Sequence, residues 1–338
     1  MRVTNSMLVS NFMNNLNTNA SKLDKLQSQL ATNRKYAHMS DDPVSVIYSQ
    51  QARYKLSRLA DYHQNVSVSK GWLQQTESGL RELNDILTSA YEACVDASTD
   101  VKSATDKENA AKYIKQLRDQ MLHTLNTAYG DKFIFGGYNT TGVTENRATT
   151  PPFTINADDK LCYNGIEINI ASMAAGGALE DLHGDVLTFD VGIGIEMPVT
   201  FNGIDVVYMG TEEIMDADGN PTGTYRTKDI FSIMDQLYKD VLAGKPADEI
   251  AKNITDLQAG QQHILGLVAE VGGRDNRLDI LISRYEQDDI NYTQMKSDAE
   301  DADQAEVIMN YKMAEAVYKA ALSAGAFIIQ PTLMDFLR

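Results

Sequence analysis

Apolar residues recur at every seventh position near the start of the chain, which is the spacing of a narrow helical seam. The main row is Val9, Leu16, Leu23 and Leu30, and the companion row is Phe12, Asn19 and Leu26. Residues 40–43 then provide side-chain oxygens that suit a helix cap, followed by Pro43, which suits a helix's first turn. The pattern therefore predicts one helix before this break and a second helix beginning at it.

The second predicted helix is long, because one heptad row continues through it with few interruptions. This row is Leu59, Val66, Leu73, Leu80, Leu87 and Cys94. A third helical stretch runs from Ile114 to Ala128 and ends at Gly130.

The last hundred residues repeat the heptad pattern. The longest row is Ile250, Leu257, Ile264, Val271, Leu278, Tyr285 and Tyr292. Residues 297–306 then contain five carboxylates and no basic residue, a composition that suits the start of another helix. The final row is Val307, Ala314, Ala321 and Ile328, and it stops before Pro331.

The middle of the chain differs from both ends, because 13 of the 22 glycines lie between residues 131 and 227. Glycine is disfavoured in long helices and common in turns. We predict short strands at 153–155, 167–170, 186–191, 196–201 and 204–208, joined by turns such as Asn164-Gly165. The predicted fold class is mainly α with an inserted β domain.

Charge and cysteine content exclude several classes of protein. With 47 acidic and 30 basic residues, the formal net charge is −17, which argues against nucleic acid or an anionic membrane surface as the partner. Cys94 and Cys162 are too few for a disulfide framework. No apolar run approaches the roughly 18 residues of a membrane span. The N-terminal segment lacks the apolar core of a cleaved signal peptide, so we expect no ordinary signal.

No catalytic or metal-binding constellation stands out in the sequence. The five histidines show no ligand-like spacing. The string 216–221 begins like a calcium loop, but Pro221 and Thr227 occupy the positions that need Gly and Glu, so a hairpin turn is the better interpretation. The acidic stretch 297–306 is better interpreted as a solvated helix end than as a metal site. We therefore expect no enzyme, no cofactor and no metal.

Two hypotheses explain the narrow seams at the two ends of the chain. The terminal helices pair with each other in an intramolecular antiparallel bundle, or the seams form a polymerisation interface with neighbouring subunits. Periodicity alone favours the intramolecular bundle.

Several short segments at both ends resemble bacterial flagellin and its junction relatives. The matching N-terminal segments are Arg2–Thr4, the Leu16/Leu23/Leu30 helix, Ser40–Pro43 and Thr76–Leu87. The matching C-terminal segments are Gly272–Asp279, Glu300–Asp303 and Phe336–Arg338. Gly130–Gly137, followed by Thr150–Phe153, resembles the start of the middle domain in the hook–filament junction branch of the family rather than in filament flagellin. One departure is Thr32-Asn33, where the family usually has a Ser-Gly or Thr-Gly pair.

The resemblance implies an extracellular structural protein of the bacterial flagellum, exported unfolded through the flagellar type III channel. Its implied partners are copies of itself in a ring, the adjacent hook-associated protein, flagellin and a cytoplasmic export chaperone, with no nucleic acid and no membrane insertion. The terminal helices are expected to be disordered in the free monomer and to order on assembly. The alternatives are filament flagellin itself and, less favoured, a secreted coiled-coil effector.

This interpretation divides the chain and assigns its interfaces. Residues 1–45 and 290–338 are expected to be assembly helices, 46–135 and 228–289 an antiparallel helical rod, and 136–227 a β-rich outer domain. The expected assembly residues are Val9, Phe12, Leu16, Leu23, Leu26, Leu30, Val307, Ala314, Ala321, Ile328, Leu333, Phe336 and Leu337. The expected chaperone-binding residues are Val307, Tyr311, Ala314, Tyr318 and Ala321.

Overall fold

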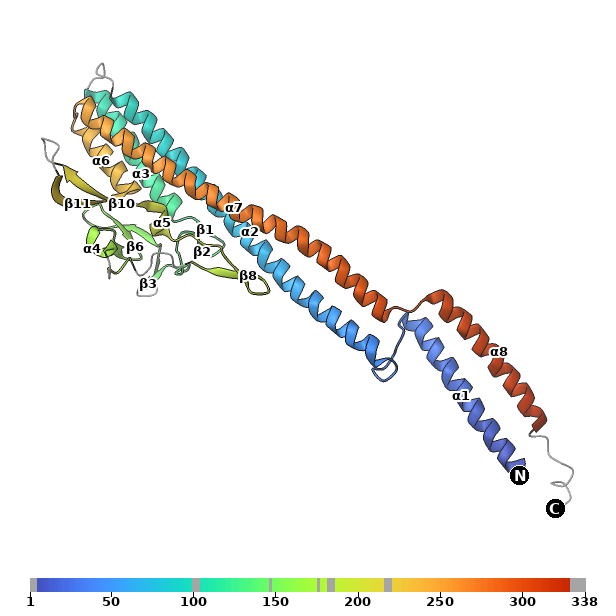
Figure 1. The fold of residues 1–338 in the computed structure, drawn as a ribbon. Coiled ribbons are helices and arrows are strands. Elements are labelled where there is room, and N and C mark those ends of the chain that lie inside the picture. Colours follow the sequence, from blue (N-terminus) through green and yellow to red (C-terminus); the bar gives the residue numbers. More distant parts are fainter. Residues whose placement is uncertain are drawn as a thin grey trace. The chain divides into compact units, whose positions relative to one another are not determined.

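The fold is described from a computed structural model that covers residues 5–98, 104–145, 148–174, 177–180, 186–215 and 221–328 (Figure 1). Its helices are α1 (Asn5–Thr32), α2 (Pro43–Ala97), α3 (Ala104–Leu125), α4 (Ile170–Met173), α5 (Gly203–Val207), α6 (Ile230–Leu242), α7 (Ala247–Glu300) and α8 (Gln304–Ile328). Its strands are β1 (Ala128–Tyr129), β2 (Lys132–Phe133), β3 (Val143–Glu145), β4 (Ala148–Thr150), β5 (Phe153–Ile155), β6 (Leu161–Tyr163), β7 (Ile166–Glu167), β8 (Thr188–Gly192), β9 (Ile195–Pro198), β10 (Tyr208–Met215) and β11 (Pro221–Asp229).

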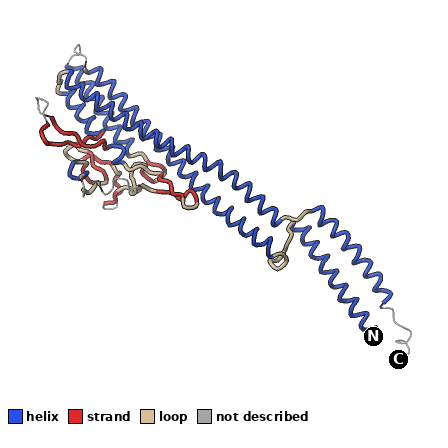
Figure 2. The backbone as a smooth tube through the Cα atoms, viewed as in Figure 1, coloured by secondary structure: helices blue, strands red, loops and turns tan. Residues whose placement is uncertain are grey.

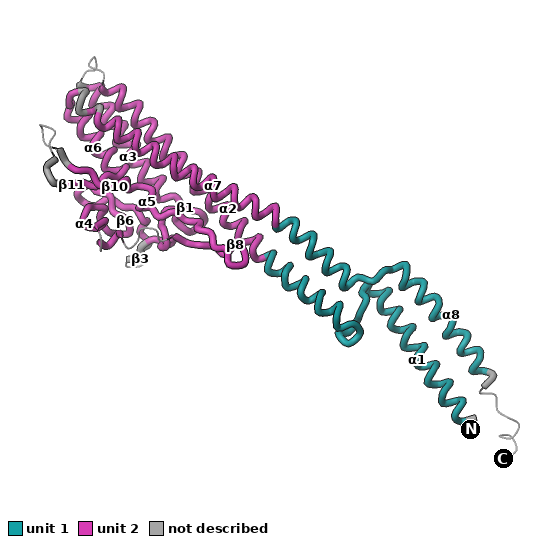
Figure 3. The backbone as a smooth tube through the Cα atoms, in the orientation of Figure 1, with its two compact units in different colours: residues 1–60, 285–338 teal, residues 61–284 magenta. Residues whose placement is uncertain are grey.

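The chain divides into two compact units, which Figure 3 colours separately. Unit 1 comprises residues 1–60 and 285–338, and unit 2 comprises residues 61–284. The long helices α2 and α7 each contribute one part to each unit. The strands of the described residues all belong to unit 2, where they lie beside its helices (Figure 2), and along the sequence they fall between the two helical ends. This arrangement confirms the predicted mainly α fold with an inserted β domain.

In unit 2, α2 and α7 run antiparallel to each other. Lys70 of α2 forms an ion pair with Asp279 of α7, and Gln261 Nε2 donates to Thr88 Oγ1 at 3.0 Å further along. The predicted heptad rows lie in this interface. The fully buried members are Val66, Leu73, Leu80, Cys94, Leu257, Ile264, Val271 and Leu278. Because every seventh residue is buried on both helices, the seam forms a continuous part of the helical core.

Two further helices complete the helical part of unit 2. α3 packs against α6, and Arg118 of α3 is joined to Asp235 of α6 at 2.5 Å, with both side chains largely buried. α6 begins after Asp229, whose carboxylate accepts the backbone N–H of Ser232. Burial raises the pKa of Asp229. Buried charges of this kind persist because each has a hydrogen-bonded partner.

The inserted region consists of small antiparallel sheets rather than one large sheet. Among the described residues, β5–β6–β7 form a three-stranded sheet and the other strands pair two by two. Phe153 and Tyr163 face each other at 5.0 Å between ring centroids and are almost fully buried. The Tyr163 hydroxyl donates to the Phe135 carbonyl at 3.2 Å, which ties this sheet to the segment that follows α3. These aromatic residues are part of the core of the region.

The predicted strands were partly correct. Residues 153–155 form β5 as predicted, and β8 and β9 overlap the predictions at 186–191 and 196–201. The predicted strand 204–208 is wrong, because residues 203–207 form α5. The Asn202 side chain accepts the N–H of Ile204 and so starts a helical turn. The prediction at 167–170 is correct only at Glu167, since Asn169 caps α4. The turn predicted at 216–220 lies outside the described residues.

No helix built from the described residues is both long and apolar enough to cross a membrane.

Candidate assembly interface

The seam predicted for the N-terminal helix lies on one face of α1. The six predicted apolar residues and Asn19 are each half-buried, while most of the positions between them are exposed. They are Val9, Phe12, Leu16, Leu23, Leu26 and Leu30. Because α1 packs against α8, this face meets α8 within the same chain. The intramolecular pairing is thus present in the structure.

The matching face of α8 carries the residues expected for assembly and chaperone binding. Val307 is buried, and Tyr311, Ala314, Tyr318 and Ala321 are half-buried. Ile328 is the last residue of α8. Leu333, Phe336 and Leu337 lie outside the described residues.

Two contacts fix the register of the antiparallel α1–α8 pair. At one end, Gln304 Nε2 donates to Asn33 Oδ1 at 3.0 Å. At the other end, the ring of Phe12 lies directly over Gly325, where an added Cβ would be only 2.7 Å from Phe12 Cε1. Because both helices rise by the same distance per residue, Leu23 lies at the same level as Ala314. In the same register, Leu16 of α1 comes level with Ala321 of α8, and these small residues of α8 let the two helices approach closely there.

Gly325 was not identified from the sequence as an interface residue. It lies within an alanine-rich helix, where a glycine usually indicates only a weak point. The available signal was its spacing of four residues from Ala321, which places it on the seam face.

The end of α1 is formed by an unusual backbone conformation. Asn33 has a φ of 58°, the left-handed conformation that glycine adopts most readily and asparagine tolerates. Asn33 can therefore end the helix at the position where the resemblance to flagellin led us to expect the glycine of a Thr-Gly pair. The Asn33 carbonyl then accepts the N–H of Ala302 at 3.1 Å.

Residues 33–35 and 300–302 form a short antiparallel bridge where α7 gives way to α8. The N–H of Lys35 donates to the Glu300 carbonyl at 2.8 Å, and Arg34 pairs with Asp301 as a β-bridge. Asp303 Oδ1 accepts the N–H of Ala305 at 2.9 Å and so caps α8. The acidic stretch 297–306 therefore contains the N-terminus that its composition predicted. Among the described residues, no group of three or more His, Cys, Asp or Glu is arranged to hold a metal.

The Glu300 side chain accepts hydrogen bonds from two residues of α2. It receives Arg53 Nε at 2.5 Å and Arg53 Nη2 at 2.7 Å, together with the Ser49 hydroxyl. The hydrogen bond from Arg53 lowers the pKa of Glu300 to about 2, overcoming the effect of its burial. A bidentate guanidinium–carboxylate pair fixes direction as well as charge. The pair thus joins α2 to the last residue of α7 within unit 1.

The face of α8 that points away from the seam is also apolar. Met309 is 59% exposed, Met313 57% and Val317 49%. They follow one another at intervals of four residues and therefore share one side of the helix. The charged residues Lys312, Glu315 and Lys319 pair among themselves on a different side. α8 is thus apolar on two faces but covered on one.

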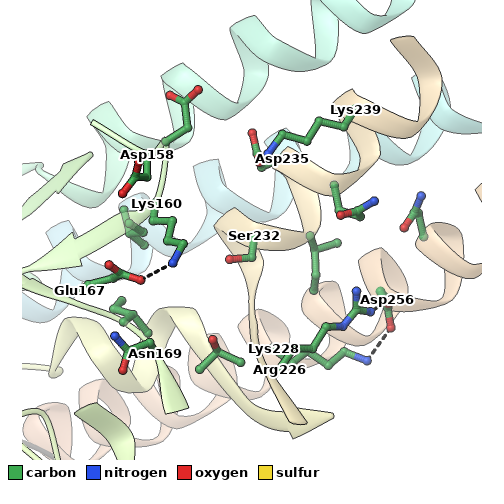
Figure 4. A pocket seen from close by; sticks show the side chains of 17 residues that line it. Asp158, Lys160, Glu167, Asn169, Arg226, Lys228, Ser232, Asp235, Lys239 and Asp256 are labelled. Atoms are coloured by element: carbon green, nitrogen blue, oxygen red, sulfur yellow. Dashed lines mark hydrogen bonds and ion pairs between the residues drawn. The ribbon is translucent and has the colours of Figure 1, made fainter. Parts of the chain in front are cut away.

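Unit 2 contains a polar pocket of about 300 Å³, which lies between the β5–β7 sheet, β11 and α6 (Figure 4). Lys160 pairs with Glu167 at 2.6 Å, and Lys228 with Asp256 at 2.5 Å. Lys239 is likewise joined to Asp235. The Lys228–Asp256 pair joins β11 to α7, whereas the other two pairs lie within the sheet region and within α6. We assign the pocket a structural role.

Comparison with known proteins supplies independent evidence on the kind of protein. The family model of the bacterial flagellin N-terminal helical region matches residues 3–140. The chain is similar to flagellar hook-associated protein 3 of Escherichia coli, with 25% identity over 342 residues and 96% of each chain covered. Similarity to a flagellin of Clostridium tyrobutyricum, 24% identical, covers only 38% of this chain and 34% of that protein.

A solved structure has a similar fold. The flagellar hook-associated protein 3 of Legionella pneumophila superimposes with a TM-score of 0.55 at 14% identity, over 73% of this chain and 96% of the other. The match to a hook-associated protein thus spans nearly the whole chain, whereas the match to the clostridial flagellin spans a part of it.

Proposed function

We propose that the chain is a hook–filament junction protein of the flagellin superfamily, which links the flagellar hook to the flagellin filament through the paired helices at its two ends. It is a component of the extracellular flagellum. The similar proteins are structural flagellar components, which favours a structural over an enzymatic role. The extensive match also favours a junction protein over filament flagellin.

The observation that supports assembly through the ends is the uncovered apolar face of α8. Side chains such as Met309 and Met313 are flexible and polarisable, so they adapt to a partner surface. A helix that is apolar on two faces is typical of a bundle with more than two helices. α1 supplies one neighbour, and the subunits on either side in a ring would supply the others. The seam residues then act in assembly by holding α8 in the orientation that presents this face.

The export chaperone is proposed to bind the seam face of α8 before assembly. Tyr311 and Tyr318 lie on that face, seven residues apart, and are the largest side chains there. The same face meets α1 in the folded chain, so binding of the chaperone and pairing with α1 would exclude each other. Release of the chaperone would then free α8 to pair. Residues 1–45 and 290–338 remain our proposed assembly segments.

The decisive experiment is the loss of the gene in the bacterium that carries it. Cells without the chain are expected to secrete flagellin into the medium and to keep bare hooks, because the first flagellins have no adaptor to bind. Flagellin in the supernatant is measured by immunoblot, and filaments are counted by electron microscopy. Complementation with the full chain should restore filaments. Cells that retain normal filaments without the chain would contradict the proposal, and so would purified chain that polymerises alone into long filaments.

A further inference from the structure

The first turns of α2 carry an exposed apolar face in unit 1. Val44 is 61% exposed, Ile47 57% and Tyr54 63%. Their spacing of three and seven residues places them on one side of the helix. The opposite side is packed, since Ser49 and Ala52 are buried. Four large side chains on this face, counting Tyr48 at 52% exposed, form a stripe that has no covering within unit 1.

The α2 stripe also lies in a basic segment of an acidic protein. Residues 43–60 contain three basic residues and no acidic residue, in a chain with a net charge of −17. Lys55 and Arg58 border the stripe, and the Arg58 guanidinium lies 5.8 Å from the Tyr54 ring centroid. Tyrosine and arginine together are the residue types that dominate the binding energy of protein interfaces. The stripe therefore has the composition of an interface for an acidic partner.

The neighbouring segment of α7 in unit 1 has the complementary charge. Residues 285–300 contain five acidic residues and one basic residue. Ile290 is 63% exposed, and Glu286, one helical turn before it, is also exposed. The segment thus presents one apolar side chain beside a carboxylate. This surface is complementary to the α2 stripe, which is apolar and has basic residues at its border.

The two faces lie on opposite sides of the α2–α7 pair in unit 1. Arg53 and Glu300 hold these segments together, and Lys55 lies over the Tyr292 ring at 5.1 Å. Tyr285 is buried in the pair, and Ile290, five residues later, is rotated about 140° away from it. One chain cannot bring two such outward faces together. Two copies placed side by side can, and the contact repeats from each copy to the next.

We propose that the α2 stripe of one subunit packs on the α7 face around Ile290 of the next subunit, as a head-to-tail contact within the junction ring. This inference rests on the proposed function, since it names the lateral contact of that ring. A contact between two different faces leaves one face free at each end of a row of subunits, and it closes only as a ring. Opposite charges at the border fix the direction in which subunits join.

Cysteine cross-linking of assembled flagella tests the contact. A full-length chain carrying Tyr54→Cys and Ile290→Cys replaces the native chain, and isolated hook–filament structures are mildly oxidised. Both native cysteines are buried, so they do not compete. We expect a ladder of covalent oligomers on a non-reducing gel, which collapses with reductant and is absent from dilute monomer. The matched control pairs Ile290→Cys with Tyr113→Cys, since Tyr113 is 47% exposed on α3, and it should give no ladder.

Three outcomes would overturn the proposal: no ladder from flagella that contain the double variant, an equal ladder from the Tyr113 control, or dimers from Tyr54→Cys alone. If the cysteine variants do not assemble, the charge pair replaces them. Arg58→Glu or Glu286→Arg alone should cause loss of swimming, and the two together should restore it; failure of the double variant to recover overturns the contact. If the proposed function itself is wrong, the chain is missing from the hook–filament fraction altogether.

Discussion

At the scale of single residues, the terminal helix pair depends on a glycine that the ring of Phe12 covers. Gly325 leaves no room for a side chain, whereas Gly273 of α7 has no atom within 4 Å of its added Cβ. Substitution by alanine is therefore expected to destabilise the structure at Gly325 and to stabilise it at Gly273. Adding a methyl group in tight packing costs roughly 1–3 kcal/mol, while alanine in an open helical site gains roughly 1 kcal/mol over glycine.

We expect Gly325→Ala to reduce the number of filament-bearing cells and Gly273→Ala to leave it unchanged. Gly273→Ala should also raise the urea midpoint of the purified chain. Filaments are counted by electron microscopy, and unfolding is followed by circular dichroism. Phe12→Leu, which shortens the covering side chain, should rescue Gly325→Ala. Normal filaments in Gly325→Ala cells would contradict the close packing of this pair.

The Glu300 carboxylate is the second feature at this scale, and its effect depends on pH. Its folded pKa of about 2 lies below the ordinary value of 4.5, so its pairing stabilises the fold above pH 4.5 and this stability is lost as the pH falls toward 2. We expect Glu300→Gln to lower the free energy of opening the bridge between 33–35 and 300–302 by roughly 1–3 kcal/mol near neutral pH. This loss is smaller than that for breaking a fully buried ion pair, because Arg53 is 45% exposed.

Hydrogen exchange at the amide of Lys35, which donates to the Glu300 carbonyl, measures this effect. The exchange rate should rise in the variant at pH 7, and the difference between variant and parent should shrink as the pH falls toward 2. Glu286→Gln, an exposed change on the same helix, is the control. An equal difference at both pH values would show that charge is not responsible.

At the scale of elements, the heptad rows predicted the long helices because burial every seventh residue leaves a strong periodic signal. Val66, Leu80 and Leu257 are buried as that signal requires. The strand prediction at 204–208 is wrong because five residues are too few to show a helical or a strand period, and the Asn202 cap decides the conformation of this segment. The bridge between residues 33–35 and 300–302 could not be predicted from the sequence. It consists of backbone hydrogen bonds between segments far apart in the chain, and such bonds do not depend on a particular side-chain pattern.

The α1 seam leads to a prediction about one element. Leu23 is half-buried against α8 at the level of Ala314, so Leu23→Asp places a charge in the apolar contact. We expect assembly to be lost, whereas the melting temperature of the free monomer should change little because the core of unit 2 dominates that transition. Ser21→Asp, on the exposed side of α1, is the matched control and should still assemble. A large fall in the melting temperature would show that α1 supports the fold of the monomer.

At the scale of the whole molecule, the two units have different kinds of core. Unit 2 combines a helical seam with buried aromatic residues such as Phe153 and Phe231, so it has the means to fold by itself. In unit 1, the α1–α8 pair buries only one narrow face of each helix. Two isolated helices with such a small contact have little stability of their own. We therefore expect the stability of α1 and α8 to depend on contacts with neighbouring subunits more than the stability of unit 2 does.

Deletion of residues 307–338 tests this division. The shortened chain is expected to retain the helical circular dichroism and cooperative unfolding of unit 2 while losing both chaperone binding and junction assembly. Co-purification with the chaperone and immunoblots of secreted flagellin report the two losses. A shortened chain that still retains filaments on the hook would contradict the role of α8, and one that no longer unfolds cooperatively would contradict the independence of unit 2.

The bridge between residues 33–35 and 300–302 has a mechanical consequence. In the proposed role, the chain carries the mechanical load between the hook and the filament. At this bridge, the segment that leaves α1 toward α2 lies beside the segment that leads from α7 into α8, and hydrogen bonds from Lys35 and Ala302 tie them to each other. A pull on either terminal helix is therefore divided between α2 and α7 at one level. Helices α2 and α7 therefore share the load, because pulling α1 or α8 away requires the hydrogen bonds of the bridge to break.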